Sequence, residues 1–344
     1  MPYRHYVNFA ALISSLVLYL WLRQILRVRF RLILAGVILL LGFSPFVYFY
    51  LQTTQAAATT CYWVGDTNPA LWNDATHWSS SSGGAGSTCD GGVVPGSDDT
   101  VIFDGLNLNS VNVDVAVSIA ALTNAGGYSG ALNTQNYSFA VAGDFQWGAG
   151  AFSAGSSAMT ISGSYSNSGT FTAGTSTVTF NATTVGKTLS GTMTGGSAFY
   201  KIAFNGVGGA WAVTNSMTVT APNALDTLVI GNGTVTLGDG LVSGSFEVDG
   251  KTTIANTAGQ TGTLQTSAVP QGQTITFDIN NNATLPSCAN CIITVGATSG
   301  AGQGNLKIRK NTVLRLNPNA TSSDTGIETE STGYLEIQGS QDDT

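Results

Sequence analysis

Three tryptophans lie close together near the start of the chain, and their side chains are the first candidates for chemistry. Trp63, Trp72 and Trp78 each offer a large flat ring, and such rings could stack on the faces of pyranose sugars. The alternative interpretation is a cap. An open end of a β-fold exposes strand edges that invite pairing with other chains, and large aromatic side chains could close it. The sequence favours the cap and keeps sugar binding by these tryptophans as the functional alternative.

The sequence contains few residues of the types that acid–base or nucleophilic catalysis uses. The chain has two histidines, His5 and His77, and we expect His77 to be a packed or surface residue. Glycoside hydrolysis needs two carboxylates placed across one groove, and lyase chemistry needs basic residues that neutralise an acidic sugar. Segments dominated by Gly, Thr, Ser and Ala offer neither as a cluster. We therefore expect no catalytic residues and no enzyme activity, with a carbohydrate-active enzyme as the alternative.

Four aspartates, Asp90, Asp98, Asp99 and Asp104, gather near the tryptophans. Calcium binding needs only oxygen ligands, but these four show no established calcium-loop spacing. Aspartate is also a common turn residue, because its side chain can bond to the backbone two residues further on. The sequence therefore predicts turns here, and it predicts neither a metal nor a cofactor.

The four cysteines suggest disulfides, because disulfides persist in exported proteins. We expect Cys61 to pair with Cys89, and Cys288 to pair with Cys291. A structural zinc site would need two close pairs of cysteines. Cys61 and Cys89 are 28 positions apart, so we do not expect zinc.

Residues 1–58 read as a membrane leader. Five of the twelve Lys and Arg residues lie there, and no acidic residue does. Two apolar runs, 6–22 and 32–51, flank an Arg-rich segment at 23–31, and the second run is 20 residues long, enough to cross a bilayer. Basic loops tend to stay in the cytoplasm, which would place the chain after residue 51 outside.

The leader therefore predicts a location in the cell envelope, with contact to membrane lipid through residues 6–51. Two versions stay open: one or two retained transmembrane helices, or cleavage near Ala58, where three alanines follow the second run. The rest of the chain is acidic, and the whole carries 12 Lys and Arg against 19 Asp and Glu. No basic patch is left for a nucleic acid, so we expect no such partner.

From about Ser110 onward, short alternating apolar stretches separated by Gly, Asn and Ser predict an all-β fold. Three segments, 130–141, 150–161 and 169–180, repeat at offsets of 19 or 20 residues. A unit of this size is too small to bury its own apolar face, but stacked units can do so. Stacked charges would repel, whereas Thr, Ser and Asn can bond along a column. We therefore predict a parallel β-helix, or β-solenoid, over residues 110–344.

The repeat also predicts which side chains stack inside this fold. The expected inward columns are Leu132/Phe152/Phe171, Phe139/Met159/Phe180 and Val141/Ile161/Val178, and the pairing could shift by one strand. A β-sandwich is the alternative, but its strands should alternate with more exposed Lys and Glu than a chain with 9% charged residues provides. At the far end we expect either a weak cap or a continuation beyond Thr344, and the second is favoured.

Residues 59–109 differ in composition from the repeats that follow them, and we expect them to form a Trp-rich cap. Within them, residues 61–104 include Cys-Tyr-Trp-Val-Gly, Leu-Trp-Asn-Asp, His-Trp-Ser, Ser-Gly-Gly-Ala-Gly and Pro-Gly-Ser-Asp-Asp. This segment resembles the N-terminal Trp/Gly motif of large β-helical surface proteins of bacteria, including autotransporter-type adhesins. With the Gly- and Phe-containing repeats after it, the resemblance covers roughly residues 61–260. No translocating barrel follows in the sequence, so secretion by the autotransporter route is not expected.

These features predict an envelope-anchored structural stalk or adhesin that recognises a surface without turnover. Its expected partners, besides membrane lipid, are a cell-surface polysaccharide or the surface of a host or partner cell. The carbohydrate-active enzyme and the sugar-binding module stay open as alternatives. Facing carboxylates in a groove would favour the enzyme, and an exposed face on Trp63, Trp72 or Trp78 would favour the module.

Overall fold

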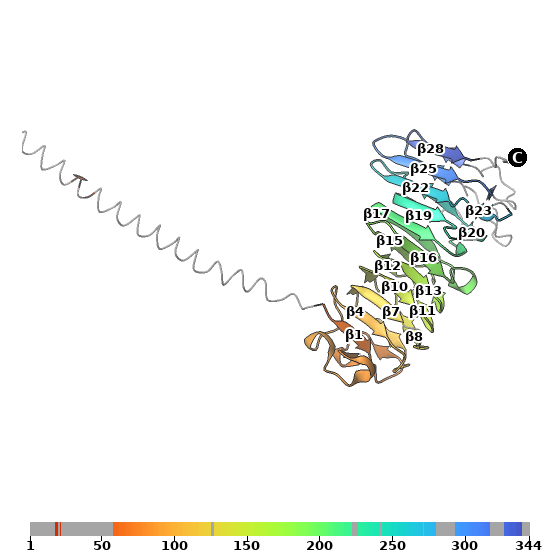
Figure 1. Ribbon diagram of the computed structural model, residues 1–344. Coiled ribbons are helices and arrows are strands. Elements are labelled where there is room, and N and C mark those ends of the chain that lie inside the picture. The colour runs from red at the N-terminus through yellow and green to blue at the C-terminus, as the bar shows by residue number, and fades with distance from the viewer. Residues whose placement is uncertain are drawn as a thin grey trace, which may run out of the picture. The chain divides into compact units, whose positions relative to one another are not determined.

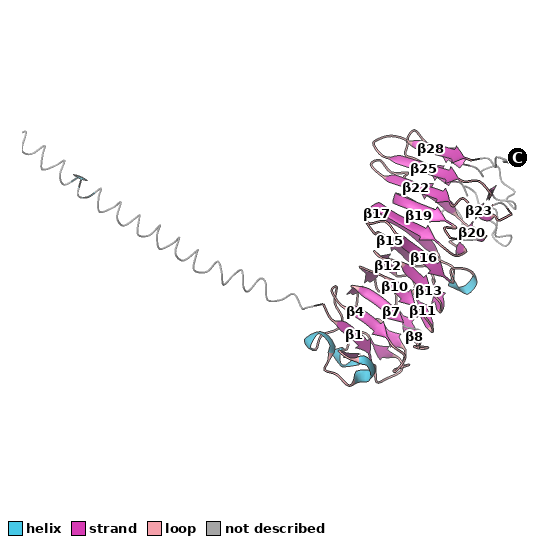
Figure 2. Ribbon diagram, viewed as in Figure 1, coloured by secondary structure: helices cyan, strands magenta, loops and turns pink. Residues whose placement is uncertain are grey.

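The structure is a computed structural model. It describes residues 58–124, 127–221, 226–240, 243–270, 272–279, 293–316 and 327–338, together with Leu18, Tyr19 and Trp21. The chain divides into two compact units, 1–56 and 57–344, and the second is all-β (Figures 1 and 2). No helix within the described residues is long and apolar enough to cross a membrane. The apolar runs 6–22 and 32–51 lie outside them except for the three leader residues just named, and so do Cys288 and Cys291.

The second unit is a stack of coils in which each coil adds strands to three positions. The first position holds β1 (Thr60–Trp63), β4 (Thr100–Phe103), β7 (Ala121–Asn124), β10 (Phe145–Trp147), β13 (Tyr165–Asn167), β16 (Lys187–Gly191), β22 (Thr261–Thr266), β25 (Gln303–Ile308) and β28 (Gly333–Ile337). The second holds β6 (Val117–Ile119), β9 (Phe139–Val141), β12 (Ala158–Ile161), β15 (Thr177–Phe180), β21 (Lys251–Ile254), β24 (Ile293–Val295) and β27 (Ile327–Thr329). Two long strands, β17 (Lys201–Val213) and β19 (Asp226–Leu237), serve both positions.

The third position is split between two smaller sheets. One contains β2 (Ala70–Leu71), β5 (Val111–Asn112), β8 (Ala131–Asn133), β11 (Ala151–Ser153) and β14 (Thr170–Thr172). The other contains β18 (Met217–Val219), β20 (Gly244–Val248), β23 (Ile275–Ile279) and β26 (Thr312–Leu316). Outside this scheme lie β3 (Trp78–Ser79) and the short 3₁₀ turns η1 (Ala75–His77), η2 (Ser82–Gly84), η3 (Cys89–Gly91) and η4 (Gly195–Ser197). The described unit is therefore made of stacked parallel sheets, the arrangement that suggests a β-helix.

The inward columns follow from the parallel register. Leu132, Phe152 and Phe171 are successive partners, as the repeat predicts. The other two predicted columns are wrong at their third member, because Val178 stacks on Met159 and Phe180 stacks on Ile161. The reason is physical: parallel strands keep one constant offset along their length, and exchanging these two residues would require the strands to cross.

The interior is filled by aromatic and aliphatic side chains stacked from coil to coil. The rings of Phe145 and Tyr165 stack with their centroids 5.2 Å apart and their planes at 10° to each other. The rings of Phe180 and Phe204 stack in the same way, with centroids 5.2 Å apart and an angle of 18° between their planes. Among the strand pairs within the described ranges, only β1–β3 is antiparallel. Two facing antiparallel layers are therefore not the architecture, and the β-sandwich alternative is excluded.

Outward-facing residues form polar ladders. Asn232 Nδ2 donates to Asn205 Oδ1 over 2.8 Å, and Gln265 Nε2 donates to Thr236 Oγ1 over 2.9 Å, each from one coil to the one before it. Such bonds need short uncharged polar side chains in every coil. This accounts for the low content of charged residues in the sequence, because a lysine or glutamate at the same place in every coil would be stacked on a residue of the same charge and repelled by it.

Candidate functional site

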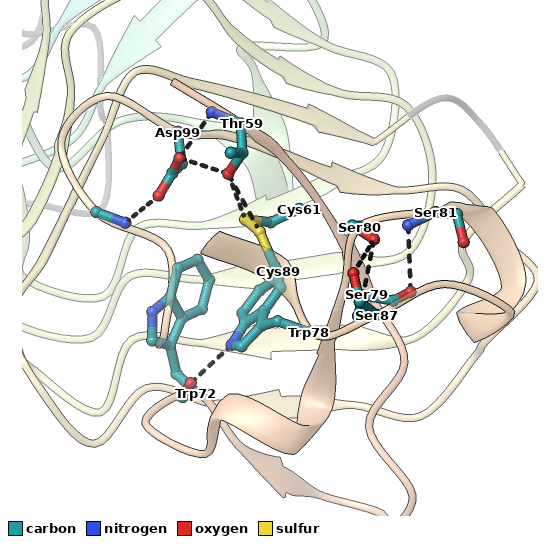
Figure 3. The surroundings of a disulfide bond; sticks show 11 residues. Thr59, Cys61, Trp72, Trp78, Ser79, Ser80, Ser81, Ser87, Cys89 and Asp99 are labelled. Atoms are coloured by element: carbon teal, nitrogen blue, oxygen red, sulfur yellow. Dashed lines mark hydrogen bonds between the residues drawn. A yellow bond between two sulfur atoms is a disulfide. The ribbon is translucent and has the colours of Figure 1, made fainter. Parts of the chain in front are cut away.

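The Trp-rich segment closes the end of the stack where β1 lies. Trp63, Trp72 and Trp78 are each 1% exposed. Trp78 packs edge-on against both others, with ring centroids at 5.0 Å from Trp63 and 4.6 Å from Trp72. Its Nε1 donates to the Trp72 carbonyl over 2.9 Å (Figure 3). Trp63 Nε1 donates to the carbonyl of Asn109, also over 2.9 Å.

This packing fits the cap that the sequence favours, and it argues against the alternative in which Trp63, Trp72 and Trp78 form a sugar-stacking platform. Stacking needs an open ring face, and here the faces are covered by other aromatic side chains and by the backbone. The indole N–H groups of Trp63 and Trp78, which a sugar hydroxyl would otherwise meet, are bonded within the cap. The physical reason is size: three indole rings bury more surface by packing together at the end of the stack than by lying open to water.

One disulfide and one strand pairing hold the cap in place. Cys61, on β1, and Cys89, at the start of η3, form a disulfide with their Cα atoms 5.3 Å apart, and this is one of the two pairs expected from the sequence (Figure 3). β1 pairs with β4 along one edge and with β3 along the other. The pairing with β3 is antiparallel and places Trp63 opposite Trp78. The β3 pairing occupies the edge of β1 at Tyr62 and Trp63, which would otherwise be open to another chain.

Asp99 is the main polar anchor of the cap. Its Oδ1 accepts from the N–H of Thr59 at 2.9 Å and from Thr59 Oγ1 at 2.7 Å, and its Oδ2 accepts from the N–H of Gly96 at 2.8 Å. Asp104 likewise accepts from the N–H of Leu106. The bonds from Gly96 and Leu106 are local turn bonds of the kind predicted, whereas the two bonds from Thr59 join segments 40 residues apart. Within the described residues, no three His, Cys, Asp or Glu side chains are placed to hold a metal ion.

Replacing Asp99 with Ala is expected to destabilise the protein by about 2 kcal/mol, because three donors lose a charged acceptor in a buried place. Asp99 is 3% exposed. Urea unfolding followed by tryptophan fluorescence measures the change. The matched control is Asp239→Ala at an exposed turn, expected within about 0.5 kcal/mol of the parent. Equal effects at the two positions would contradict the anchoring role.

His77 is packed inside the cap. Its Nδ1 lies 2.7 Å from the Leu71 carbonyl and its Nε2 lies 3.1 Å from Asp66 Oδ1. The ring meets Trp63 edge-on at 5.7 Å, and the residue is 6% exposed. Both ring nitrogens are thus engaged in holding the Trp72 turn, and nothing in this geometry aims the imidazole at a bound molecule.

A shallow depression of about 380 Å³ lies at the corner where β17, β19 and β22 turn from one position to the next. Its lining includes Val185, Val207, Thr234 and Thr263 and contains no titratable or aromatic side chain. Gly233 shapes it, because its φ is +88° and a Cβ there would lie 2.7 Å from the Trp211 ring. The depression can accept a small neutral polar group, but it has no acid, base or stacking ring.

A pair of carboxylates lies elsewhere, on the outer side of the β20–β23–β26 sheet. Glu247 and Asp278 are register partners on β20 and β23, and Arg315 on β26 is next in the same row. Asp278 is 3% exposed; its Oδ2 lies 3.6 Å from Arg315 Nη1, and its Oδ1 is buried without a hydrogen-bond partner among the described residues. Burial raises the pKa of both carboxyls. Asp249 and Asp278 also raise that of Glu247, and Arg315 opposes the shift at Asp278.

The raised pKa of Asp278 predicts a definite pH dependence. The folded state holds the proton more tightly than the unfolded chain, so stability falls as pH rises from about 4 through the raised pKa of the folded state. Asp278→Asn cannot ionise, and its stability should fall less over that interval than the parent's. Urea midpoints at several pH values measure this. Asp239→Asn is the control and should keep the parent profile; an Asp278→Asn profile identical to the parent would contradict the prediction.

The sequence reading missed the Glu247–Asp278 pair, although a signal for it exists. An apolar–charged–apolar triplet recurs at 246–248, 277–279 and 314–316. The spacings between these triplets are irregular, unlike the 19–20 residue repeat that was recognised earlier in the chain. The register of the strands is therefore what brings the three charged residues into one row.

Comparison with known proteins adds no relative. No family model, curated protein or solved structure matches this chain. The likeness to bacterial β-helical surface proteins therefore rests on the motifs alone, and what the structure establishes is an all-β fold of stacked parallel sheets without an identified family.

Proposed function

We propose that this chain is a non-catalytic β-solenoid, anchored in the cell envelope by residues 1–58, that acts outside the membrane as a structural stalk or adhesin. One observation carries the proposal: the parallel register continues from β4 to β28, with the other end closed by the Trp-rich cap. Such a stack is stiff because every coil is bonded to the next, and it can present one kind of surface over its whole length.

The chemistry of the outer surface supports recognition without turnover. The polar ladders offer hydroxyl and amide groups in rows, which suits hydrogen bonding to a cell-surface polysaccharide or to another cell's surface. The corner depression lacks titratable groups, and the carboxylate pair belongs to a different sheet. Among the described residues, this depression and this carboxylate pair thus lie in different places.

The location can be tested with the full chain in intact bacterial cells. We expect Val207→Cys, whose parent side chain is 72% exposed, to react with a membrane-impermeant maleimide without lysis. Gln24→Cys, in the basic segment 23–31, is the matched control and should react only after lysis. Adhesion is then scored as retention of chain-producing cells on polysaccharide-coated or cell-coated surfaces. Labelling of Val207→Cys only after lysis would contradict the proposal.

A carbohydrate-active function is the second candidate, and the Glu247–Asp278 pair favours it. Adjacent strands are about 4.8 Å apart, close to the separation of about 5–5.5 Å between the carboxyl groups of retaining glycosidases. The test is release of reducing ends or unsaturated products from polysaccharides. Activity that disappears in both Glu247→Gln and Asp278→Asn would establish this candidate and overturn the non-catalytic proposal.

A further inference from the structure

The imidazole ring of His77 faces hydrogen-bond acceptors on both of its nitrogen atoms. Its Nδ1 lies 2.7 Å from the Leu71 carbonyl oxygen, and its Nε2 lies 3.1 Å from Asp66 Oδ1 and 3.8 Å from Asp74 Oδ2. A carbonyl oxygen and an ionised carboxylate can only accept hydrogen bonds. Both ring nitrogens therefore have to donate, and only the doubly protonated, positively charged imidazole carries two N–H groups.

The two carboxylates are placed to stay ionised. The Asp66 side chain is 77% exposed, and water therefore stabilises its charge. The hydroxyl and then the backbone N–H of Thr76 lower the pKa of Asp74, and His77 lowers it further. A protonated carboxyl that donates to a neutral ring is thus disfavoured at both residues. The proton between the ring and Asp66 therefore belongs to the ring.

The surrounding sequence also favours a positive charge at this place. Residues 59–186 contain eight aspartates and no glutamate, lysine or arginine, so His77 is the one side chain in that range that can become a cation. Opposite charges nearby favour the charged form of an ionisable group. Within the described residues, the ion-pair partners of His77 are Asp66 and Asp74.

The elements packed around the ring carry few other ionisable groups, and these are engaged elsewhere. On β1, Trp63 meets the ring edge-on at 5.7 Å, while Tyr62 alternates to the outer face. β2, β3 and η1 carry no other ionisable side chain. In the loops beyond them, Asp114 accepts from the N–H of Asn73, and Asp104 accepts from a backbone N–H of its own turn. The two ion-paired carboxylates are therefore the groups that respond when the ring loses its proton.

Through His77 the segment 64–71 is held against the rest of the cap. The ring contacts Leu71 and Asp66, which lie 6 and 11 residues before it, and the His77 carbonyl accepts from the N–H of Val64 over 2.9 Å. Because His77 is buried, water cannot readily replace a lost bond. A neutral ring would keep one donor, and its other nitrogen would turn a lone pair toward the Asp66 carboxylate.

We propose that His77 is a pH-sensitive latch of the Trp-rich cap. With two ring protons it donates to the Leu71 carbonyl and to Asp66, and this state holds the segment 64–71 in place. With one ring proton it keeps the bond to Leu71 and releases Asp66. Histidine changes charge between about pH 5 and 8, and the fold supplies acceptors for the protonated form. The stability that the latch adds to the cap is therefore present in mild acid and is lost as the pH rises through that interval.

Nitrogen NMR of the full chain in detergent solution, labelled with ¹⁵N-histidine, reads the ring directly. The His5→Gln variant leaves His77 as the only histidine. We expect both ring nitrogens to carry a proton at about pH 5 and Nδ1 alone to carry one at about pH 9, because the Leu71 carbonyl retains the Nδ1 proton. An unbonded neutral histidine prefers the proton on Nε2, so an Nε2–H ring at the alkaline end, or a singly protonated ring at the acid end, overturns the proposal.

Amide exchange at Val64 measures whether the ring holds the cap, because this N–H donates to the His77 carbonyl. The reference is the N–H of Phe145, which donates to the Ser164 carbonyl deeper in the stack. The ratio of the two protection factors removes the intrinsic effect of pH on exchange. We expect the protection of Val64 relative to Phe145 to fall about tenfold between about pH 5 and 8, the effect of losing one hydrogen bond to a charged group.

Two matched variants separate the latch from a general effect of pH. The amide of Asp66→Asn can accept from a protonated Nε2 and donate to a neutral one, so Val64 should keep its protection over the whole interval. Asp114→Asn changes a carboxylate that accepts from the N–H of Asn73, and it should keep the parent's fall. Constant protection of Val64 in the parent, or equal falls in the parent and Asp66→Asn, overturns the proposal. Neither measurement depends on where the chain is located or on what its surface binds, so the latch stands or fails independently of the proposed function.

Discussion

Replacing Phe152 with Ala is expected to lower the free energy of unfolding by about 4 kcal/mol, the largest effect of any single substitution considered. Phe152 is 0% exposed and stacks on Leu132 below and Phe171 above, with ring centroids 5.8 Å from Phe171. Alanine would leave a cavity that neighbouring coils cannot close without breaking their register, and the expected loss lies in the middle of the range of about 3–5 kcal/mol for buried phenylalanine. Urea unfolding followed by tryptophan fluorescence measures it, since Trp147 lies 5.4 Å away.

The next residue in the chain supplies the matched control. Ser153 lies on the same strand but faces outward, so Ser153→Ala should change stability by no more than about 0.5 kcal/mol. Phe152→Leu should fall between the two, because it keeps most of the buried volume. If Phe152→Ala and Ser153→Ala were equally mild, β11 could not alternate between core and solvent as the structure has it, and the inward column would be the wrong description of this sheet.

Much of this column could be predicted from the sequence because two signals agree there. The offset of 19 or 20 between Leu132, Phe152 and Phe171 is regular, and the strands are short enough for alternation to mark the inner face. At Val178 and Phe180 both residues are apolar, so alternation alone could not say which stacked on Met159. Only the constant offset of a parallel ladder decides that question.

The later coils and the tryptophans were harder for different reasons. The strands β17 and β19 merge two positions into one, and their register shifts near Asn205, so no fixed period marks them. The row of Glu247, Asp278 and Arg315 depends on how β20, β23 and β26 pair with one another, and it was not foreseen. For Trp63, Trp72 and Trp78, the sequence could show that large rings cluster but not whether their faces would be open. Burial at a fold's end is a property of the assembled stack.

Removing the disulfide between Cys61 and Cys89 is expected to cost about 3.5 kcal/mol, an effect confined to the cap. The bond closes a loop of 28 residues, and the entropy that it removes from the unfolded chain corresponds to that value in the loop-closure model. In a stack, each coil is stabilised mainly by its neighbours. The double variant Cys61→Ala/Cys89→Ala should therefore lose amide protection at β1 and β4 and keep it at β22 and β25, which hydrogen exchange can resolve strand by strand.

The chain carries its own control for this prediction. Cys288→Ala/Cys291→Ala removes the other two cysteines and should leave the protection of β1 and β4 unchanged. Adding a reductant to that control should then reproduce the loss seen in Cys61→Ala/Cys89→Ala, because one disulfide is the common cause. Uniform loss of protection from β1 to β28 would mean that the stack unfolds as one cooperative body. In that case the Trp-rich segment could not be a local cap, because loss of its disulfide would lower amide protection at β28 as much as at β1.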